Sequence, residues 1–424
     1  MEIKELIKKI TKLKENIRKT TSHYVNSHKF SEVEINGNKI AYDIRDILLI
    51  GAIIGTDVLI TGKTGSGKTE LSKGVMTALF GTRYWNKTVT YSMNPSDFID
   101  IDFKGLREGK KSLKEAIEPS RAVNYPGIVL NEINRVPEPV QALLIPFFDR
   151  EFEAEGKEVP VGVQTKKGRY QYRIATINEG ERYIVVRMDE AITDRAGIVI
   201  PLDMFPQYPE DVVEMLKKKK RECDPNEFNG NEKLVIEIFE NIDAIPEDEE
   251  VVEFITFLSS LSNCLKSETK SKETIEFNLS ICQGCHQSGY FYNLCGNIWA
   301  PSPRVLINLY KMAKGLALLR LATAKDTPEK VLMKDVIAGA PFILFRKMGI
   351  NRDWVKNKFQ GSEWLAIEKI LINIETRFDE YMSEVKKIKN EKSQIEKLKI
   401  AKEWRERNPW YGATISELSR KTID

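Results

Sequence analysis

Gly62-Lys63-Thr64-Gly65-Ser66-Gly67-Lys68-Thr69 matches the pattern G-x-x-x-x-G-K-[ST] without a mismatch. The residues before it, 57–61, predict a short buried strand, and residues 70–80 after it predict a helix. Glycines let such a loop curl, so that consecutive N–H groups point at phosphate oxygens beside the positive end of the helix. Lys68 can then reach the outer phosphates, and the Thr69 hydroxyl can bind Mg²⁺. The stretch from Gly62 to Glu70 therefore predicts a site for a nucleoside triphosphate, ATP with Mg²⁺.

The composition is ordinary for a globular protein. The chain has 424 residues, room for two or three domains, with 42% apolar and 30% charged residues. Its net charge of +3 is too small to indicate nucleic acid by itself. Residues 1–19 alternate lysine with apolar residues and do not resemble a signal peptide, and the longest apolar run, 47–55, is too short to cross a bilayer. Five cysteines do not suggest a disulfide framework, so we expect a cytoplasmic protein.

Working outward from the loop, the pattern predicts alternating strands and helices. Upstream we expect a hairpin over 33–42, with an Asn36-Gly37 turn, and a helix over 43–55. Downstream the β-branched and apolar runs predict strands over 88–91, 127–131, 172–178 and 198–202. Helices are expected near 113–117 and over 139–148, and the turns Glu155-Gly156 and Lys167-Gly168 bound one expected hairpin.

Two polar residues follow buried strands of this set. Glu132 follows the apolar strand 127–131, whose tip we expect beside the phosphate loop, where a carboxylate could hold the attacking water. Asn178 ends the strand 172–178 and could orient that water or touch the γ-phosphate.

Four short sequence motifs, taken in order, resemble the signatures of a MoxR-like AAA+ ATPase over roughly residues 40–345. They are Asn131-Glu132-Ile133-Asn134-Arg135-Val136-Pro137, Ala175-Thr176-Ile177-Asn178, Ile192-Thr193-Asp194-Arg195 and Pro301-Ser302-Pro303-Arg304. The resemblance implies an α/β fold, with a P-loop AAA+ αβα core followed by a helical lid. It also implies a ring hexamer with ATP between neighbouring subunits, and segments 94–110 and 155–172 that project towards a substrate.

The resemblance assigns a role to each matching residue. Glu132 would be the hydrolytic base and Asn178 a sensor. Arg195 would be the finger that reaches the next subunit's site, and Arg304 a second sensor on the lid. An ordinary ion pair remains the alternative reading for both arginines.

Two positions depart from the family pattern. Asn131 stands where the family has an aspartate that holds Mg²⁺ through its hydration shell, and an amide keeps the oxygen but loses the charge. Ala196 stands where the family usually has phenylalanine after the finger.

Four cysteines, Cys264, Cys282, Cys285 and Cys295, form a possible metal site. Two of them have the C-x-x-C spacing of zinc ligands, and the Gly- and Ser-rich stretch around them has little apolar core of its own. We predict one structural Zn²⁺. An iron–sulfur cluster or plain thiols are the alternatives, and His286 could replace Cys264 as the fourth ligand.

The expected domains are an N-terminal amphipathic helix (1–30), the core (31–206), the lid (207–348, with the cysteine insert at 264–295) and a helical extension (349–424). Apolar residues from Ile367 to Ile395 recur at four-three spacing, which has the form of a coiled-coil seam. This seam could pair with the N-terminal helix, with a partner, or within its own domain.

The sequence therefore predicts an ATPase whose ring uses hydrolysis to remodel a protein partner. For the partner, the resemblance implies a protein with a von Willebrand factor A domain. Two alternatives remain: a nucleotide-gated assembly module with little hydrolysis, and an AAA+ motor on nucleic acid. Nothing in the sequence names the substrate or fixes the oligomer number.

Overall fold

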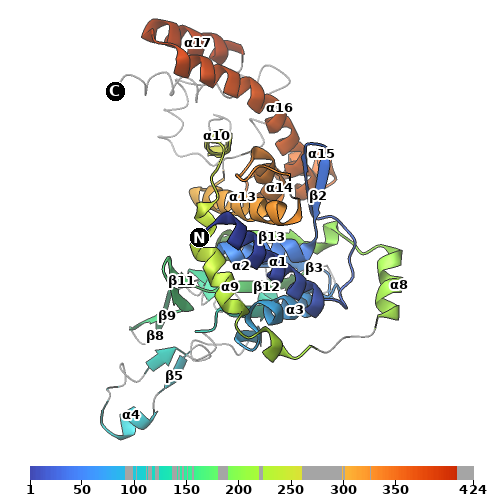
Figure 1. Cartoon of the computed structure of the whole chain (residues 1–424), viewed down its shortest axis with the longest axis vertical. Coiled ribbons are helices and arrows are strands. Elements are labelled where there is room, and N and C mark those ends of the chain that lie inside the picture. Colours follow the sequence, from blue (N-terminus) through green and yellow to red (C-terminus); the bar gives the residue numbers. More distant parts are fainter. Residues whose placement is uncertain are drawn as a thin grey trace. The chain divides into compact units, whose positions relative to one another are not determined.

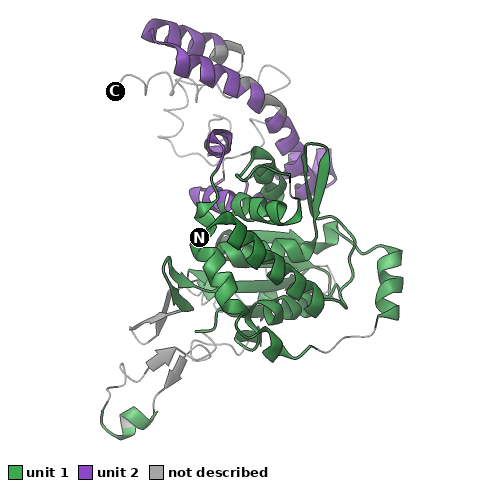
Figure 2. Ribbon diagram, viewed as in Figure 1, with its two compact units in different colours: residues 1–246, 311–342 green, residues 247–310, 343–424 purple. Residues whose placement is uncertain are grey.

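The computed structural model describes residues 1–90, 99–101, 103–110, 112, 117–119, 124–135, 141, 144–145, 148–149, 151–154, 157–179, 190–218, 223–259, 298, 301–324 and 326–407. The chain divides into two compact units (Figure 2). Unit 1 holds residues 1–246 and 311–342, and unit 2 holds residues 247–310 and 343–424. These bounds differ from the expected domains, which stay a prediction.

Unit 1 is built on a five-stranded sheet with the order β13-β3-β12-β7-β4. Its strands β13, β3 and β12 are labelled in Figure 1. The strands are β13 (Ile198–Pro201), β3 (Val58–Gly62), β12 (Tyr172–Asn178), β7 (Gly127–Asn131) and β4 (Tyr84–Thr88), and every neighbouring pair is parallel. The first four are buried along their whole length, as expected for a parallel sheet whose strands are continuous apolar runs. The predicted α/β core is confirmed.

β12 lies between β7 and the P-loop strand β3. The tip of β7 still reaches the phosphate loop, as expected, because Oγ1 of Thr69 donates to Oδ1 of Asn131 at 3.2 Å. One predicted strand was wrong. The strand expected over 88–91 is β4, which ends at Thr88. β4 pairs only with β7 at the edge of the sheet and is partly exposed, so its polar residues hid it from a search for apolar runs.

Four helices of unit 1 pack on one another: α1 (Ile3–Thr20), α2 (Ile44–Ile54), α3 (Lys68–Phe80) and α9 (Asn231–Asn241). α1 turns Leu6, Ile10, Leu13 and Ile17 inward, as its spacing predicts. Asp43 caps α2, and its side chain accepts hydrogen bonds from the N–H groups of Arg45 and Asp46. The N-terminal helix is thus part of unit 1 and packs on α3 and α9.

α13 (Pro303–Thr323) begins in unit 2 and α14 (Met333–Leu344) ends there, but residues 311–323 of α13 and 333–342 of α14 belong to unit 1. α13 packs closely on α2: a Cβ added to Gly315 would lie 2.5 Å from Cγ2 of Ile50. Arg320 and Asp335 join the two helices through a fully buried ion pair of 3.0 Å. Residues 311–342 therefore complete the core of unit 1.

The described part of unit 1 also contains four two-stranded antiparallel sheets. They are β1 (Ser31–Ile35) with β2 (Asn38–Tyr42), β5 (Ile99–Ile101) with β6 (Ile117–Pro119), β8 (Glu151–Ala154) with β9 (Lys157–Pro160), and β10 (Val163–Thr165) with β11 (Gly168–Tyr170). The first confirms the Asn36-Gly37 turn. The single hairpin expected between 155 and 168 is wrong, because two successive hairpins occupy that stretch. Ile117 lies in a strand rather than in the helix expected near 113–117.

Further helices of unit 1 with described bounds are α4 (Phe103–Arg107), α7 (Glu190–Arg195) and α8 (Pro209–Lys217). Short 3-10 turns are η2 (Ile133–Arg135), η3 (Leu202–Met204), η4 (Pro225–Phe228) and η5 (Ile242–Ala244). In the segment expected to be helical over 139–148, the described residues 141, 144, 145 and 148 are helical.

The described regular elements of unit 2 are helices, apart from an isolated antiparallel β-bridge between Ile298 and Ile350. Besides parts of α13 and α14 the unit contains α10 (Glu249–Ser259), α15 (Arg352–Phe359), α16 (Glu363–Asn390) and α17 (Gln394–Arg407). The seam residues of α16 from Ile367 to Ile388 are buried, and Phe378 and Tyr381 contact Phe257 of α10. Lys389 of α16 pairs with Glu249 and Glu253 of α10. The seam is therefore filled, at least in part, within unit 2; Ile395 on α17 is 77% exposed.

None of the helices in the described ranges combines the length and the apolar character needed to span a bilayer.

Candidate nucleotide site

The P-loop leaves β3 at Gly62 and enters α3 at Lys68. Gly62, Gly65 and Gly67 have φ angles of 148°, 87° and 79°, which side chains rarely tolerate. A Cβ on Gly67 would also lie 3.0 Å from the ring of Tyr24, and one on Gly62 would lie 3.1 Å from Cβ of Leu202. The glycines of the motif are therefore required by backbone conformation and, at two positions, by close contact.

Lys68 is held inside the loop. Its Nζ donates to the carbonyl oxygens of Gly62 and Lys63, both at 2.7 Å, and to Oγ of Ser66 at 3.2 Å. Burial lowers the pKa of Lys68, and the nearby carboxylates of Asp203 and Glu132 act in the opposite direction. The ammonium group of Lys68 is thus bound by the atoms of the loop, and the carboxylates of Asp203, Glu132 and Glu179 lie close enough to affect its pKa.

Thr69 and Asn131 meet at the end of the sheet. Oγ1 of Thr69 donates to Oδ1 of Asn131 at 3.2 Å, and Nδ2 of Asn131 donates to Oδ1 of Asn86 at 2.8 Å. The amide of Asn131 is therefore oriented by both neighbours, with its oxygen towards Thr69. The two residues expected to hold Mg²⁺ lie together, and both present neutral oxygens.

Glu132 and Asn178 also lie together, at the ends of β7 and β12. Nδ2 of Asn178 donates to Oε1 of Glu132 at 2.9 Å. The backbone N–H of Glu132 donates to Oγ1 of Thr176 at 3.1 Å, and Glu132 itself has a φ of 60°. A non-glycine residue in this conformation is strained by about 1–2 kcal/mol, so its neighbours must hold it there.

The structure adds residues that the sequence patterns did not indicate. Oδ1 of Asp203 accepts a hydrogen bond from the N–H of Lys63 at 3.1 Å. Nε2 of His23 lies 3.6 Å from Oε2 of Glu70, next to Tyr24 at the P-loop. These residues belong to segments far from the motif in sequence and carry no local pattern, so only the tertiary fold reveals them.

Arg195 and Arg304, the two expected arginines, lie in different units. Nε of Arg195 donates to Oδ2 of Asp149 at 2.6 Å, and its Nη1 donates to the carbonyl of Ala191 at 3.2 Å. Arg304 lies in the first turn of α13 in unit 2, and its side chain is exposed. The predicted helix start at Ser302-Pro303 is confirmed, with Oγ of Ser302 accepting from the N–H of Val305.

The four cysteines predicted to bind zinc lie outside the described residues. Within the described part of the chain, no cluster of three or more His, Cys, Asp or Glu side chains could hold a metal ion. The zinc site therefore stays a prediction, which metal analysis of protein purified without chelator tests; less than one zinc per chain would contradict it.

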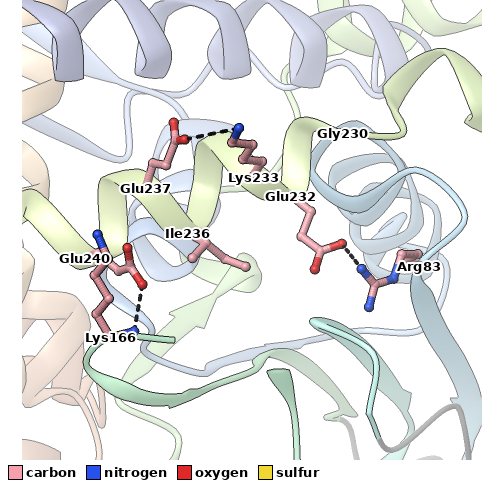
Figure 3. Close-up of a pocket in the computed structure, with 8 residues that line it drawn as sticks. All are labelled: Arg83, Lys166, Gly230, Glu232, Lys233, Ile236, Glu237 and Glu240. Atoms are coloured by element: carbon pink, nitrogen blue, oxygen red, sulfur yellow. Dashed lines mark hydrogen bonds and ion pairs between the residues drawn. The ribbon is translucent and has the colours of Figure 1, made fainter. Parts of the chain in front are cut away.

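A pocket of about 560 Å³ is lined by residues of α9 together with Arg83, Lys166 and Gly230 (Figure 3). Its acidic residues are already paired: Glu232 with Arg83 at 2.6 Å, Glu240 with the N–H of Lys166 at 2.7 Å, and Glu237 with Lys233 at 4.0 Å. None of its lining residues belongs to the motif, so it is not the nucleotide site.

Comparison with known proteins agrees with this geometry. Residues 57–196 match the AAA domain (dynein-related subfamily). The chain contains an AAA domain. The match includes the P-loop and also Asn131, Glu132, Asn178 and Arg195, whereas Arg304 lies beyond it.

A candidate ATPase from Cytophaga hutchinsonii has the same fold. It aligns with a TM-score of 0.59 and 19% identity over 87% of this chain and 96% of its own. A full-length MCM homolog from Methanopyrus kandleri aligns with a TM-score of 0.36 and 15% identity over 71% and 55%, which is too low to support an argument. No curated protein matches the sequence. The AAA domain and the shared fold bear out the resemblance to MoxR-like AAA+ ATPases predicted from the motifs.

Proposed function

We propose that the AAA domain hydrolyses ATP, with Glu132 as the general base. The observation that carries the proposal is the pair of Glu132 and Asn178, 2.9 Å apart at the ends of adjacent strands. β12, the second of these strands, also pairs with the P-loop strand β3. Both side chains therefore lie at the carboxyl ends of the parallel strands, the same end of the sheet from which the phosphate loop leaves β3.

Each residue has a physical task in this proposal. Lys68 and the N–H groups of the loop bind the outer phosphates, and Lys68 exchanges its contacts with loop carbonyls for contacts with phosphate oxygens. Glu132 takes a proton from the attacking water, while the amide of Asn178 keeps the carboxylate aimed at that water. Positioning and charge stabilisation account for most of the catalysis expected in phosphoryl transfer.

The donor set next to the loop fits Mg²⁺. Thr69 and Asn131 supply two neutral oxygens, and this cation commonly takes few protein ligands, with phosphate oxygens and water as the rest. When bound, Mg²⁺ would neutralise charge on the β- and γ-phosphates. Asn131 contributes no charge, so we expect the binding of Mg²⁺ to depend more than usual on the phosphates.

The substitution Glu132→Gln tests the proposal. Losing the base should lower the ATPase turnover at least about a hundredfold, while ATP binding stays intact because Lys68 and the loop are unchanged. Turnover is measured by phosphate release, and binding by titration with a fluorescent ATP analogue. Turnover within a factor of two of the parent would remove Glu132 from this role.

For the whole assembly, we propose a MoxR-like ring hexamer in the cytoplasm that remodels a protein partner. The motif phrases and the AAA domain support this reading. Arg195 would serve the neighbouring subunit's site and Arg304 would act as the sensor of the lid. A partner with a von Willebrand factor A domain, as the resemblance implies, should increase the ATPase turnover when added to the purified ring; unchanged turnover and no binding would argue against such a partner.

A second candidate is a nucleotide-gated assembly module that binds ATP but hydrolyses it very slowly. Asn131 favours this reading, because it removes a negative charge next to the Mg²⁺ position. Steady-state ATPase activity with and without DNA separates the candidates. Turnover near zero in both would favour the module, and stimulation by DNA would favour a nucleic-acid motor.

A further inference from the structure

The turn that follows β7, residues 132–135, is tied to the end of β12 by side chains as well as by the sheet. Asn134 lies in this turn on η2 and is 5% exposed. Its Nδ2 donates to the carbonyl of Asn178 at 2.8 Å, and its Oδ1 accepts from the N–H of Asn178 at 3.3 Å. One side chain thus satisfies both backbone groups of the residue whose own amide contacts Glu132.

This pairing requires an amide of this length. A buried backbone N–H and C=O that lose their partners cost about 1–3 kcal/mol each. Aspartate could accept from the N–H of Asn178 but could not donate to its carbonyl, and its charge would lie against that carbonyl oxygen. Alanine and leucine could do neither.

Arg135 holds the other oxygen of the Glu132 carboxylate. Its Nε lies 3.1 Å from Oε2 of Glu132, whereas Asn178 contacts Oε1. The N–H of Arg135 also donates to the carbonyl of Glu132 at 3.0 Å, which closes the turn. The carboxylate is therefore fixed from two sides, on a residue whose φ of 60° would otherwise relax.

We infer that Asn134 and Arg135 are positioning residues for the hydrolytic pair: Asn134 fixes Asn178, and Asn178 and Arg135 together fix the direction of the Glu132 carboxylate. This inference rests on the proposed function of Glu132. It gives a physical role to the two residues that follow Glu132 and Ile133 in the motif. Neither residue is expected to touch ATP.

The test compares Asn134→Asp with a matched control, Asn231→Asp, in the full chain. Asn231 is also a buried asparagine of unit 1, 6% exposed, and its Nδ2 donates to the carbonyl of Ala78 at 2.7 Å, away from Glu132. We expect Asn134→Asp to lower kcat at least about tenfold with an unchanged Kd for ATP, because a tenfold change needs only about 1.4 kcal/mol of lost positioning. Asn231→Asp should lower the stability similarly but keep kcat.

Three further variants separate a positioning role from damage to the fold. Arg135 is half exposed, so Arg135→Ala should fold; it should lower kcat several-fold, and Arg135→Lys should restore part of the loss. The double variant Asn134→Asp with Asn178→Ala should be no slower than Asn178→Ala alone, because both changes act through the contact between the Asn178 amide and the Glu132 carboxylate.

The inference is overturned if Asn134→Asp and Arg135→Ala hydrolyse ATP as fast as the parent while Glu132→Gln is inactive. It is also overturned if Arg135→Ala is faster than the parent, since Arg135 would then restrain the base instead of aiming it. Full turnover in Glu132→Gln would instead contradict the proposed function itself. If Asn134→Asp does not fold, the result for Arg135→Ala decides.

Discussion

At the scale of single residues, Asn131 is the main departure from the family pattern, which has an aspartate at this position. Its amide is used at both ends: the oxygen accepts from Thr69 and the nitrogen donates to Asn86. In an aspartate at position 131, a carboxylate oxygen would replace Nδ2 and would lie about 2.8 Å from Oδ1 of Asn86. Asn86 is exposed, so its amide can rotate and donate instead. The site can therefore accommodate the negative charge of an aspartate at position 131.

Asn131→Asp should lower the Mg²⁺ concentration needed for half-maximal ATPase activity, by up to about tenfold for 1.4 kcal/mol of added attraction. The measurement is a Mg²⁺ titration at fixed ATP. Asn86→Ala in the parent background serves as the control, since it removes the orienting contact without adding charge. An unchanged or higher Mg²⁺ requirement would mean that another group already supplies the charge.

Sequence reasoning found the residues of the site that belong to local motifs. Lys68, Thr69, Glu132 and Asn178 follow strands or begin a helix, so pattern and position in the chain were enough. Asp203 was missed, because its contact with Lys63 joins residues 140 positions apart. The pairing of Asn134 with Asn178 was missed for the same reason, although Asn134 had been noted as part of a motif.

At the scale of elements, periodicity predicted those that bury a regular face and failed at exposed edges. α1 and the seam of α16 were predicted because their apolar residues repeat at helical spacing, and β7 and β12 because they are short β-branched and apolar runs. β4 was misplaced because an edge strand can be polar, and the order of the strands was not predicted because a list of strands does not determine which pairs are neighbours.

The seam of α16 gives a prediction on one helix. Ile374 is fully buried in the seam, whereas Ile372 is 54% exposed. Ile374→Ala should lower the free energy of unfolding by about 2–5 kcal/mol through lost burial and the cavity left behind. Ile372→Ala, the control, should change it by less than about 0.5 kcal/mol. Urea denaturation followed by circular dichroism measures both; equal effects would show that the seam is not packed as described.

At the scale of the whole molecule, the proposed ring can be tested through Arg195. Its guanidinium is held by Asp149 and the carbonyl of Ala191, which orient it from within its own chain. If Arg195 acts on the neighbouring subunit, Arg195→Ala should lower the turnover by about 10³.

Mixing Arg195→Ala subunits with Lys68→Ala subunits should then restore part of the activity. At some interfaces an intact P-loop would meet an intact arginine from the other variant. Each variant alone provides the control. No recovery on mixing, together with a monomer by light scattering in the presence of ATP, would contradict the ring.

The discontinuous make-up of unit 1 has a consequence for how the protein is made. Residues 311–342, which pack on α2 near Ile50, are synthesised 65 or more residues after the first segment of the unit ends at residue 246. At about 5–20 residues per second, the ribosome needs roughly 5–20 s to pass from residue 246 to residue 342. During that time the sheet and the P-loop can form, but the apolar surface of α2 lacks its cover. We therefore expect the nascent chain to present this surface to chaperones, or to other nascent chains, until the part of α13 around Gly315 has left the ribosome.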